Sequence, residues 1–107
     1  MGDALHSLEA QYLFLTQHLA DILAACQTDD QRNQVRASYV AARRNYWNAI
    51  NQIFHDDDPQ IEQVVSQMKD AQDSLQTMTQ DLANIAKVIT AITTAVKVGT
   101  ELASMAG

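Results

Sequence analysis

The chain has 107 residues, of which only 3 are Gly and 1 is Pro, and it carries a formal net charge of −6. So few turn-forming residues argue against a sandwich or barrel of many short strands, and a hydrophobic content of 47% argues against a disordered chain. The acidity argues against general nucleic-acid binding, because contacts with phosphates need clustered Lys and Arg.

The first predicted helix covers about residues 3–27. Further apolar residues lie outside its main seam, so we expect the helix to contact more than one neighbour. Cys26 is the only cysteine, so it cannot form a disulfide within the chain, and we expect a buried thiol. An intermolecular disulfide or a reactive thiol is the alternative. The seam recurs in steps of three and four and consists of Leu5, Leu8, Tyr12, Leu15, Leu19, Ile22 and Cys26.

A polar stretch at residues 27–34 predicts that the first helix ends there. Thr28 followed by Gln31 matches a capping box, in which the hydroxyl accepts a backbone N–H and the glutamine reaches back. Since no Gly or Pro enforces a break, a continuous helix with a polar waist is the alternative. The second helix is predicted over about residues 30–55, with the seam Val35, Tyr39, Ala42, Tyr46, Ala49 and Ile53.

A clear helix start follows at Asp56-Asp57-Asp58-Pro59. Asp58 can accept backbone N–H groups as N-cap, and Pro59 suits the first helical position, where no donor is needed. The residue before a proline disfavours α geometry, so the second helix must end by this point. We expect all three aspartates to lie at the positive end of the next helix.

One long third helix is predicted over about residues 59–105. Its apolar positions recur every 3.5 residues on average, the spacing of a coiled-coil seam. After Leu82 the apolar surface becomes too broad for one neighbour to cover. We expect it to be covered by the first helix, a second copy, another protein or lipid. The seam is Ile61, Val64, Met68, Ala71, Leu75, Met78, Leu82, Ile85, Ile89, Ile92, Val96, Gly99 and Ala103.

Together these elements predict a single all-α domain, residues 1–107. The fold is either a three-helix bundle or a long helical hairpin, with coiled-coil packing and an extended C-terminal helix. The basic stretch 28–55 and the acidic stretch 56–81 would complement each other as antiparallel neighbours.

No catalytic, cofactor-binding or metal-ligating residue is predicted. His6, His18 and His55 are too scattered for a metal site, and no phosphate loop, dinucleotide fingerprint or nucleophile elbow is present. Active sites usually lie on loops held by a scaffold, and this chain has few loops. We therefore expect a protein that is not an enzyme.

The predicted interaction surface lies on the late part of the third helix, where the apolar face is broadest. A secondary anchor is formed by Arg43, Arg44 and Trp47, because Trp and Arg are enriched at interface hot spots. The alternative for this cluster is that its aromatics pack in the core while its arginines pair with the acidic third helix. The residues predicted for the main surface are Ile85, Val88, Ile89, Ile92, Val96 and Leu102.

These features favour a helical protein–protein interaction module, such as an adaptor, an immunity-type inhibitor or a chaperone-like subunit. We expect a dimer or higher oligomer, or a complex with a protein partner. A membrane-active, translocator-like protein that inserts its C-terminal helix into lipid is the alternative function. Only nine residues between Lys87 and Lys97 lack charge, too few to cross a bilayer. No signal peptide is visible, so we expect a cytoplasmic location, with export by a dedicated secretion apparatus as the alternative.

Overall fold

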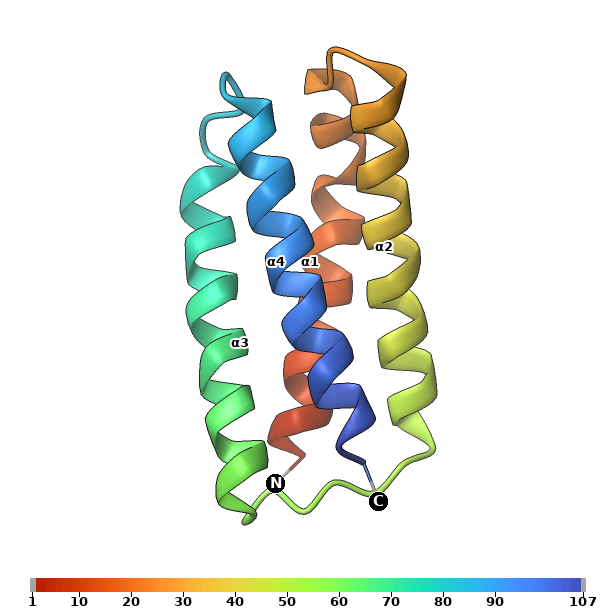
Figure 1. The fold of residues 1–107 in the computed structure, drawn as a ribbon, viewed down its shortest axis with the longest axis vertical. Helices are drawn as coiled ribbons and strands as arrows, with labels where there is room; N and C mark the ends of the chain where they lie inside the picture. The colour runs from red at the N-terminus through yellow and green to blue at the C-terminus, as the bar shows by residue number, and fades with distance from the viewer. Residues whose placement is uncertain (1, 107) are drawn as a thin grey trace.

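Residues 2–106, which the computed structural model describes, form a bundle of four α-helices without strands. The start of α1 and the end of α4 lie at the end of the bundle that holds the α2–α3 connection (Figure 1). The predicted all-α fold is confirmed, but a fourth helix replaces the three-helix bundle or hairpin. The helices are α1 (Asp3–Ala25), α2 (Asp29–Ile50), α3 (Pro59–Met78) and α4 (Ile85–Ser104), and the bundle measures 42 × 22 × 18 Å.

The helices form two antiparallel hairpins, α1–α2 and α3–α4, that pack against each other (Figure 1). Both α1 and α4 pack against α2 and α3, and they also touch each other across the centre. In the part of the chain that the structure describes, α2 and α3 do not pack together, because they stand at opposite corners. The basic stretch 28–55 and the acidic stretch 56–81 are therefore not the neighbours that the sequence predicted.

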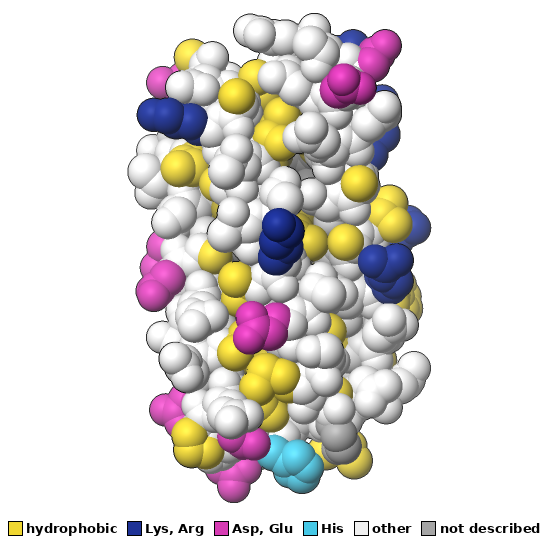
Figure 2. Space-filling view, in the orientation of Figure 1, with side chains coloured by type: hydrophobic (Ala, Val, Ile, Leu, Met, Phe, Trp, Pro, Cys, Tyr) yellow, Lys and Arg dark blue, Asp and Glu magenta, His cyan; other side chains and the backbone are white. Residues whose placement is uncertain are grey.

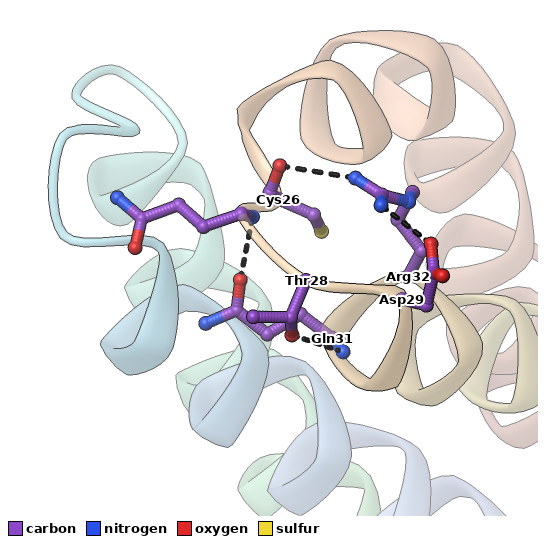
Figure 3. A network of polar contacts seen from close by, with 6 residues as sticks. Cys26, Thr28, Asp29, Gln31 and Arg32 are labelled. Carbon is purple, nitrogen blue, oxygen red and sulfur yellow. Dashed lines mark hydrogen bonds and ion pairs between the residues drawn. The ribbon is translucent and has the colours of Figure 1, made fainter.

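The turn between α1 and α2 confirms the Thr28 half of the predicted capping box and excludes a continuous helix. The Gln31 backbone N–H donates to Thr28 Oγ1 at 3.1 Å, and Gln31 Oε1 accepts from the Gln27 N–H at 2.6 Å (Figure 3). The glutamine thus reaches one residue before the N-cap. Arg32 holds the turn from the other side, since it donates to the Cys26 carbonyl at 3.3 Å and pairs with Asp29 at 2.6 Å. The hydrogen bond from Arg32 lowers the pKa of Asp29.

The connection between α2 and α3 confirms the predicted helix start but changes the role of one aspartate. Asp58 Oδ1 accepts the Gln60 N–H at 2.9 Å, and Pro59 occupies the first turn of α3. Asp56 instead accepts the N–H groups of Gly2 at 2.9 Å and Ala4 at 3.2 Å. It therefore caps α1, whose N-terminus lies at the same end of the bundle.

The long third helix predicted over residues 59–105 is wrong, because the chain folds back at residues 79–84. Polar side chains there bond to the backbone in place of the helical pattern. Asp81 Oδ1 accepts the Ala83 N–H at 3.0 Å, and Asn84 Oδ1 accepts the Lys87 N–H at 3.4 Å. Such short side chains compete with helix hydrogen bonds. The fold-back lets α4 pack along α3, which shields apolar surface that a straight helix would leave in water.

Two apolar clusters fill the bundle, and α4 contributes to both. One lies near the α1–α2 turn and includes Ile22 and Ile92, and the other lies near the opposite end and includes Leu8, Ile61 and Leu102. Full burial of a side chain of this size stabilises a fold by about 1.5–3 kcal/mol. The α4 helix therefore ties both halves of the core together.

A buried glutamine sets the contact between α1 and α4. Gln11, which is 2% exposed, donates from Nε2 to the Ala95 carbonyl at 2.8 Å. A Cβ at Gly99 would come within 2.5 Å of Gln11 Oε1, and this oxygen has no hydrogen-bond partner among the described residues. Glycine at position 99 thus allows the two helices to approach.

Candidate interaction surface

The structure places the six α4 residues predicted as the main interface inside the core. Their exposed fractions range from 0% to 5%, because α2 and α3 pack along α4 and α1 contacts it across the centre. The apolar surface predicted after Leu82 is therefore covered by other helices of the same chain. The residues concerned are Ile85, Val88, Ile89, Ile92, Val96 and Leu102.

The predicted secondary anchor, in contrast, lies on the outside of the bundle. Trp47 is 58% exposed, and Arg43 and Arg44 are also exposed. Val40, one turn before Arg44, is 44% exposed. We call the outward surface of Arg36, Val40, Arg43, Arg44 and Trp47 the α2 face. The alternative prediction, in which the aromatics of this cluster pack in the core, is wrong for Trp47.

Small and polar residues form the inward side of α2, which explains why its large side chains lie outside. The buried positions are Val35, Ser38, Ala42, Asn45 and Ala49. They differ from the predicted seam because Ser38 and Asn45 replace Tyr39 and Tyr46, a rotation of one residue. Asn45 is satisfied inside, since Nδ2 donates to Thr100 Oγ1 at 3.0 Å.

Three packed tyrosine rings lie at the boundary between α1 and α2 beside this face, with Tyr12 stacked on Tyr46 and tilted against Tyr39. The Tyr12 ring lies 5.9 Å from that of Tyr39 and 5.7 Å from that of Tyr46, centroid to centroid. Tyr46 donates from its hydroxyl to Glu9 at 2.8 Å, and this bond raises the pKa of Tyr46. The Trp47 ring lies 6.1 Å from that of Tyr46. An exposed tryptophan thus rests on a packed support, which favours a defined contact surface.

The arginines of the α2 face have no acidic partner inside the bundle. Over residues 2–106, the ion pair between Arg32 and Asp29 is the only one. Arg43 lies over the Tyr39 ring, 6.0 Å from its centroid. Figure 2 shows basic side chains along much of the edge formed by α2, with acidic ones at its upper end, and mostly acidic side chains along the opposite edge, where one basic side chain lies near the top. The predicted pairing of these arginines with the acidic segment is therefore not made within one copy.

The outward side of α3 forms the opposite surface, which the sequence reasoning missed. We call the exposed residues Pro59, Glu62, Ser66 and Asp70 the α3 face. With the neighbouring Gln63 and Gln67 they line a shallow hollow of about 490 Å³. The spacing of four residues between Glu62, Ser66 and Asp70 was visible in the sequence. Nothing in the sequence indicated that this side of the helix points outward.

A second hollow adjoins the α2 face near the end of the bundle. Arg44 and Trp47 border it together with amide side chains, and its volume is about 530 Å³. The lining passes from α2 to residues 100–104 of α4. The surface around Trp47 is therefore concave on one side, which suits the docking of a protruding side chain.

Other candidate chemistry finds less support in the geometry. Cys26 is buried, and its Sγ donates to the Ile22 carbonyl at 3.3 Å. Within residues 2–106, no three His, Cys, Asp or Glu side chains are grouped so that they could hold a metal ion. Across the same residues, no helix combines the length and apolar character needed to cross a membrane.

The chain was compared with models of protein families, with curated proteins and with solved structures, and none of them matches it.

Proposed function

We propose that this chain is a helical protein–protein interaction module that docks a polypeptide through the α2 face. The observation that carries the proposal is the exposure of Trp47, 58% open to solvent between Val40 and two exposed arginines. Burying a large aromatic ring is favourable, and a folded protein gains nothing from leaving it in water.

The composition of the α2 face supports this function. Tryptophan and arginine dominate binding energy at interfaces, typically as a few residues near the centre of the contact. Here Trp47 lies at the C-terminal end of the face, Arg43 and Arg44 precede it by one turn, and Val40 adds an apolar contact. The Tyr46 ring beside Trp47 restricts the indole, which reduces the ordering cost of binding, because an anchor that is already held loses less freedom.

The alternative function, insertion of residues 85–105 into lipid, gains no support from the fold. The apolar side chains of α4 already contact three other helices. The bundle would have to open before they could reach a membrane.

Site-directed photocrosslinking in the native cell tests the proposal. A photoreactive phenylalanine derivative replaces Trp47 in one strain and Leu13 in another. Leu13 is a matched control, because it is an apolar residue of α1 that is 53% exposed. We expect a polypeptide adduct from position 47 that is absent or much weaker from position 13. Equal adducts from both positions, or none from position 47, would contradict docking through the α2 face.

A further inference from the structure

We infer that the polypeptide docked on the α2 face is a second copy of this chain, which contributes its α3 face. This inference rests on the proposed function and names the partner. The α2 face carries Arg36, Arg43 and Arg44, whereas the α3 face carries Glu62 and Asp70. Opposite corners of one copy thus have complementary charge, and the separation of α2 and α3 prevents them from meeting inside that copy.

The two faces also share one spacing. Arg36, Val40 and Arg44 follow each other at intervals of four residues, as do Glu62, Ser66 and Asp70. At 1.5 Å per residue, each interval is about 6 Å along the helix axis.

An antiparallel contact aligns all three residues of one series with the three residues of the other. It places Arg36 opposite Asp70 and Arg44 opposite Glu62, with small Ser66 opposite Val40. The same register brings Trp47 to Pro59, so the exposed indole gains an apolar partner.

The parallel register that pairs the same residues is disfavoured by charge. Pairing Arg36 with Glu62 and Arg44 with Asp70 would place Arg43 opposite Lys69. Like charges in direct opposition are unfavourable. The antiparallel register sets Gln63 opposite Arg43 instead, which avoids the repulsion.

The fold makes this contact self-propagating. The α2 and α3 helices already run in opposite directions, and the end of α2 and the start of α3 lie at the same end of the bundle (Figure 1). Two copies therefore make the antiparallel contact when they stand side by side in the same orientation. In such a pair one copy keeps its α3 face free and the other keeps its α2 face free. A contact between two different faces that does not close yields an open chain of copies.

The net charge of −6 opposes association at long range. At 0.1 M salt the Debye length is about 10 Å, so repulsion between whole copies is largely screened, while contacting pairs keep most of their attraction. Exposed ion pairs mainly set orientation. We therefore infer that the charged pairs fix the alignment of the two helices, and that the contact between Trp47 and Pro59 supplies most of the attraction.

Complementary half-blocked variants test the inference. The first variant carries Arg36→Glu and Arg44→Glu and keeps a working α3 face. The second carries Glu62→Lys and Asp70→Lys and keeps a working α2 face. All four positions are exposed to solvent, and circular dichroism checks that each variant is folded. Sedimentation velocity follows the mass from about 10 μM to about 1 mM, the range of weak contacts.

We expect the mass of the unmodified chain to rise with concentration beyond that of a dimer at 0.1 M salt, and the association to weaken at 1 M salt as the charged pairs are screened. Each variant alone should stay monomeric. An equimolar mixture should associate again and extend beyond a dimer, because the unmodified α2 and α3 faces are complementary and the two charge-reversed faces are complementary to each other as well. A chain with all four substitutions should associate again, since its charges are exchanged.

Trp47 reports on the same contact, because it is the only tryptophan in the chain. Its emission should shift to the blue when the variants are mixed. A mixture that stays monomeric, or an unmodified chain that is monomeric at the highest concentration, would overturn the inference. If position 47 then still crosslinks to a different protein in the cell, the proposed function stands without self-assembly. If position 47 gives no adduct at all, the proposed function fails as well.

Discussion

The α2 and α4 helices place their large side chains on opposite sides of the fold. The buried positions of α4 are mostly branched apolar residues, such as Ile89 and Ile92, whereas those of α2 are mostly small or polar, such as Ala42 and Asn45. The largest side chain of α2, that of Trp47, is left outside. Helix α4 therefore supplies much of the bulk of the core, whereas α2 turns small and polar side chains to the core and its largest side chain to solvent.

The difference shows that the amount of apolar surface on a helix does not indicate which part of it binds other molecules. Helix α4 has the broadest apolar face, but it contacts all three other helices, and they cover that face. Helix α2 lacks contact with α3, so one side of it is left without a neighbour inside the chain. An interaction surface is the apolar surface that remains after the helices of one copy have packed.

Replacing one valine of α4 and one valine of α2 with aspartate tests the difference between the two helices most directly. Val88 of α4 is 2% exposed, and Val40 of α2 is 44% exposed. We expect Val88→Asp to cost more than about 4 kcal/mol of unfolding free energy, because it buries an unpaired charge. Val40→Asp should change it by less than about 1 kcal/mol. Urea denaturation followed by circular dichroism measures both, and equal losses would show that the two helices do not differ in this way.

A methyl group at Gly99 sharpens the comparison, because it tests how closely α4 lies against α1. Gly99→Ala would press a Cβ against Gln11 Oε1, and moving that side chain would strain its hydrogen bond to Ala95. We expect a loss of about 1–3 kcal/mol, typical of overpacking. Thermal or urea unfolding gives the value.

The matched control places Gly99→Ala in a chain that already carries Gln11→Ala. With the clash removed, the higher helix propensity of alanine should dominate, so the second substitution should stabilise by up to about 1 kcal/mol. The same sign in both backgrounds would mean that Gln11 does not limit the approach of the helices.

The smallest expected effect is on the ionisation of Tyr46, beside the α2 face. Its hydrogen bond to Glu9 raises the pKa of Tyr46, so this bond contributes to stability below the ordinary tyrosine pKa and is lost as the pH rises through the raised value. We expect Tyr46→Phe to remove the tyrosine ionisation that occurs at the highest pH. Ultraviolet titration of phenolate absorbance detects this, and an unchanged final phase would place Tyr46 in open solvent.

Some features of the fold were predictable because they depend on neighbouring residues. The Thr28 and Asp58 caps and the helix start at Pro59 are local hydrogen-bonding and dihedral effects, and the structure confirms them. The break at residues 79–84 was not predicted. The apolar spacing from Met78 through Leu82 to Ile85 continues across the turn, so periodicity gave no sign of it.

The candidate site was predicted only in part. Trp47, Arg43 and Arg44 were recognised as an anchor because of their residue types, but their exposure depends on which side of α2 faces inward. Tyr39 and Tyr46 have the spacing of a core seam, yet Ser38 and Asn45 occupy it. Large and small residues at the same period are equally compatible with a helix, and the choice is made by the helix that packs against them.

Local chemistry along the chain is thus enough to establish that it is helical, where two of its turns lie and how their caps are built, since hydrogen bonds between near neighbours decide these features. Packing decides the rest. The fold-back of α4, the burial of its apolar face and the diagonal separation of α2 from α3 follow from which helices become neighbours. That outcome minimises the apolar surface of the whole bundle, a quantity that no single segment specifies.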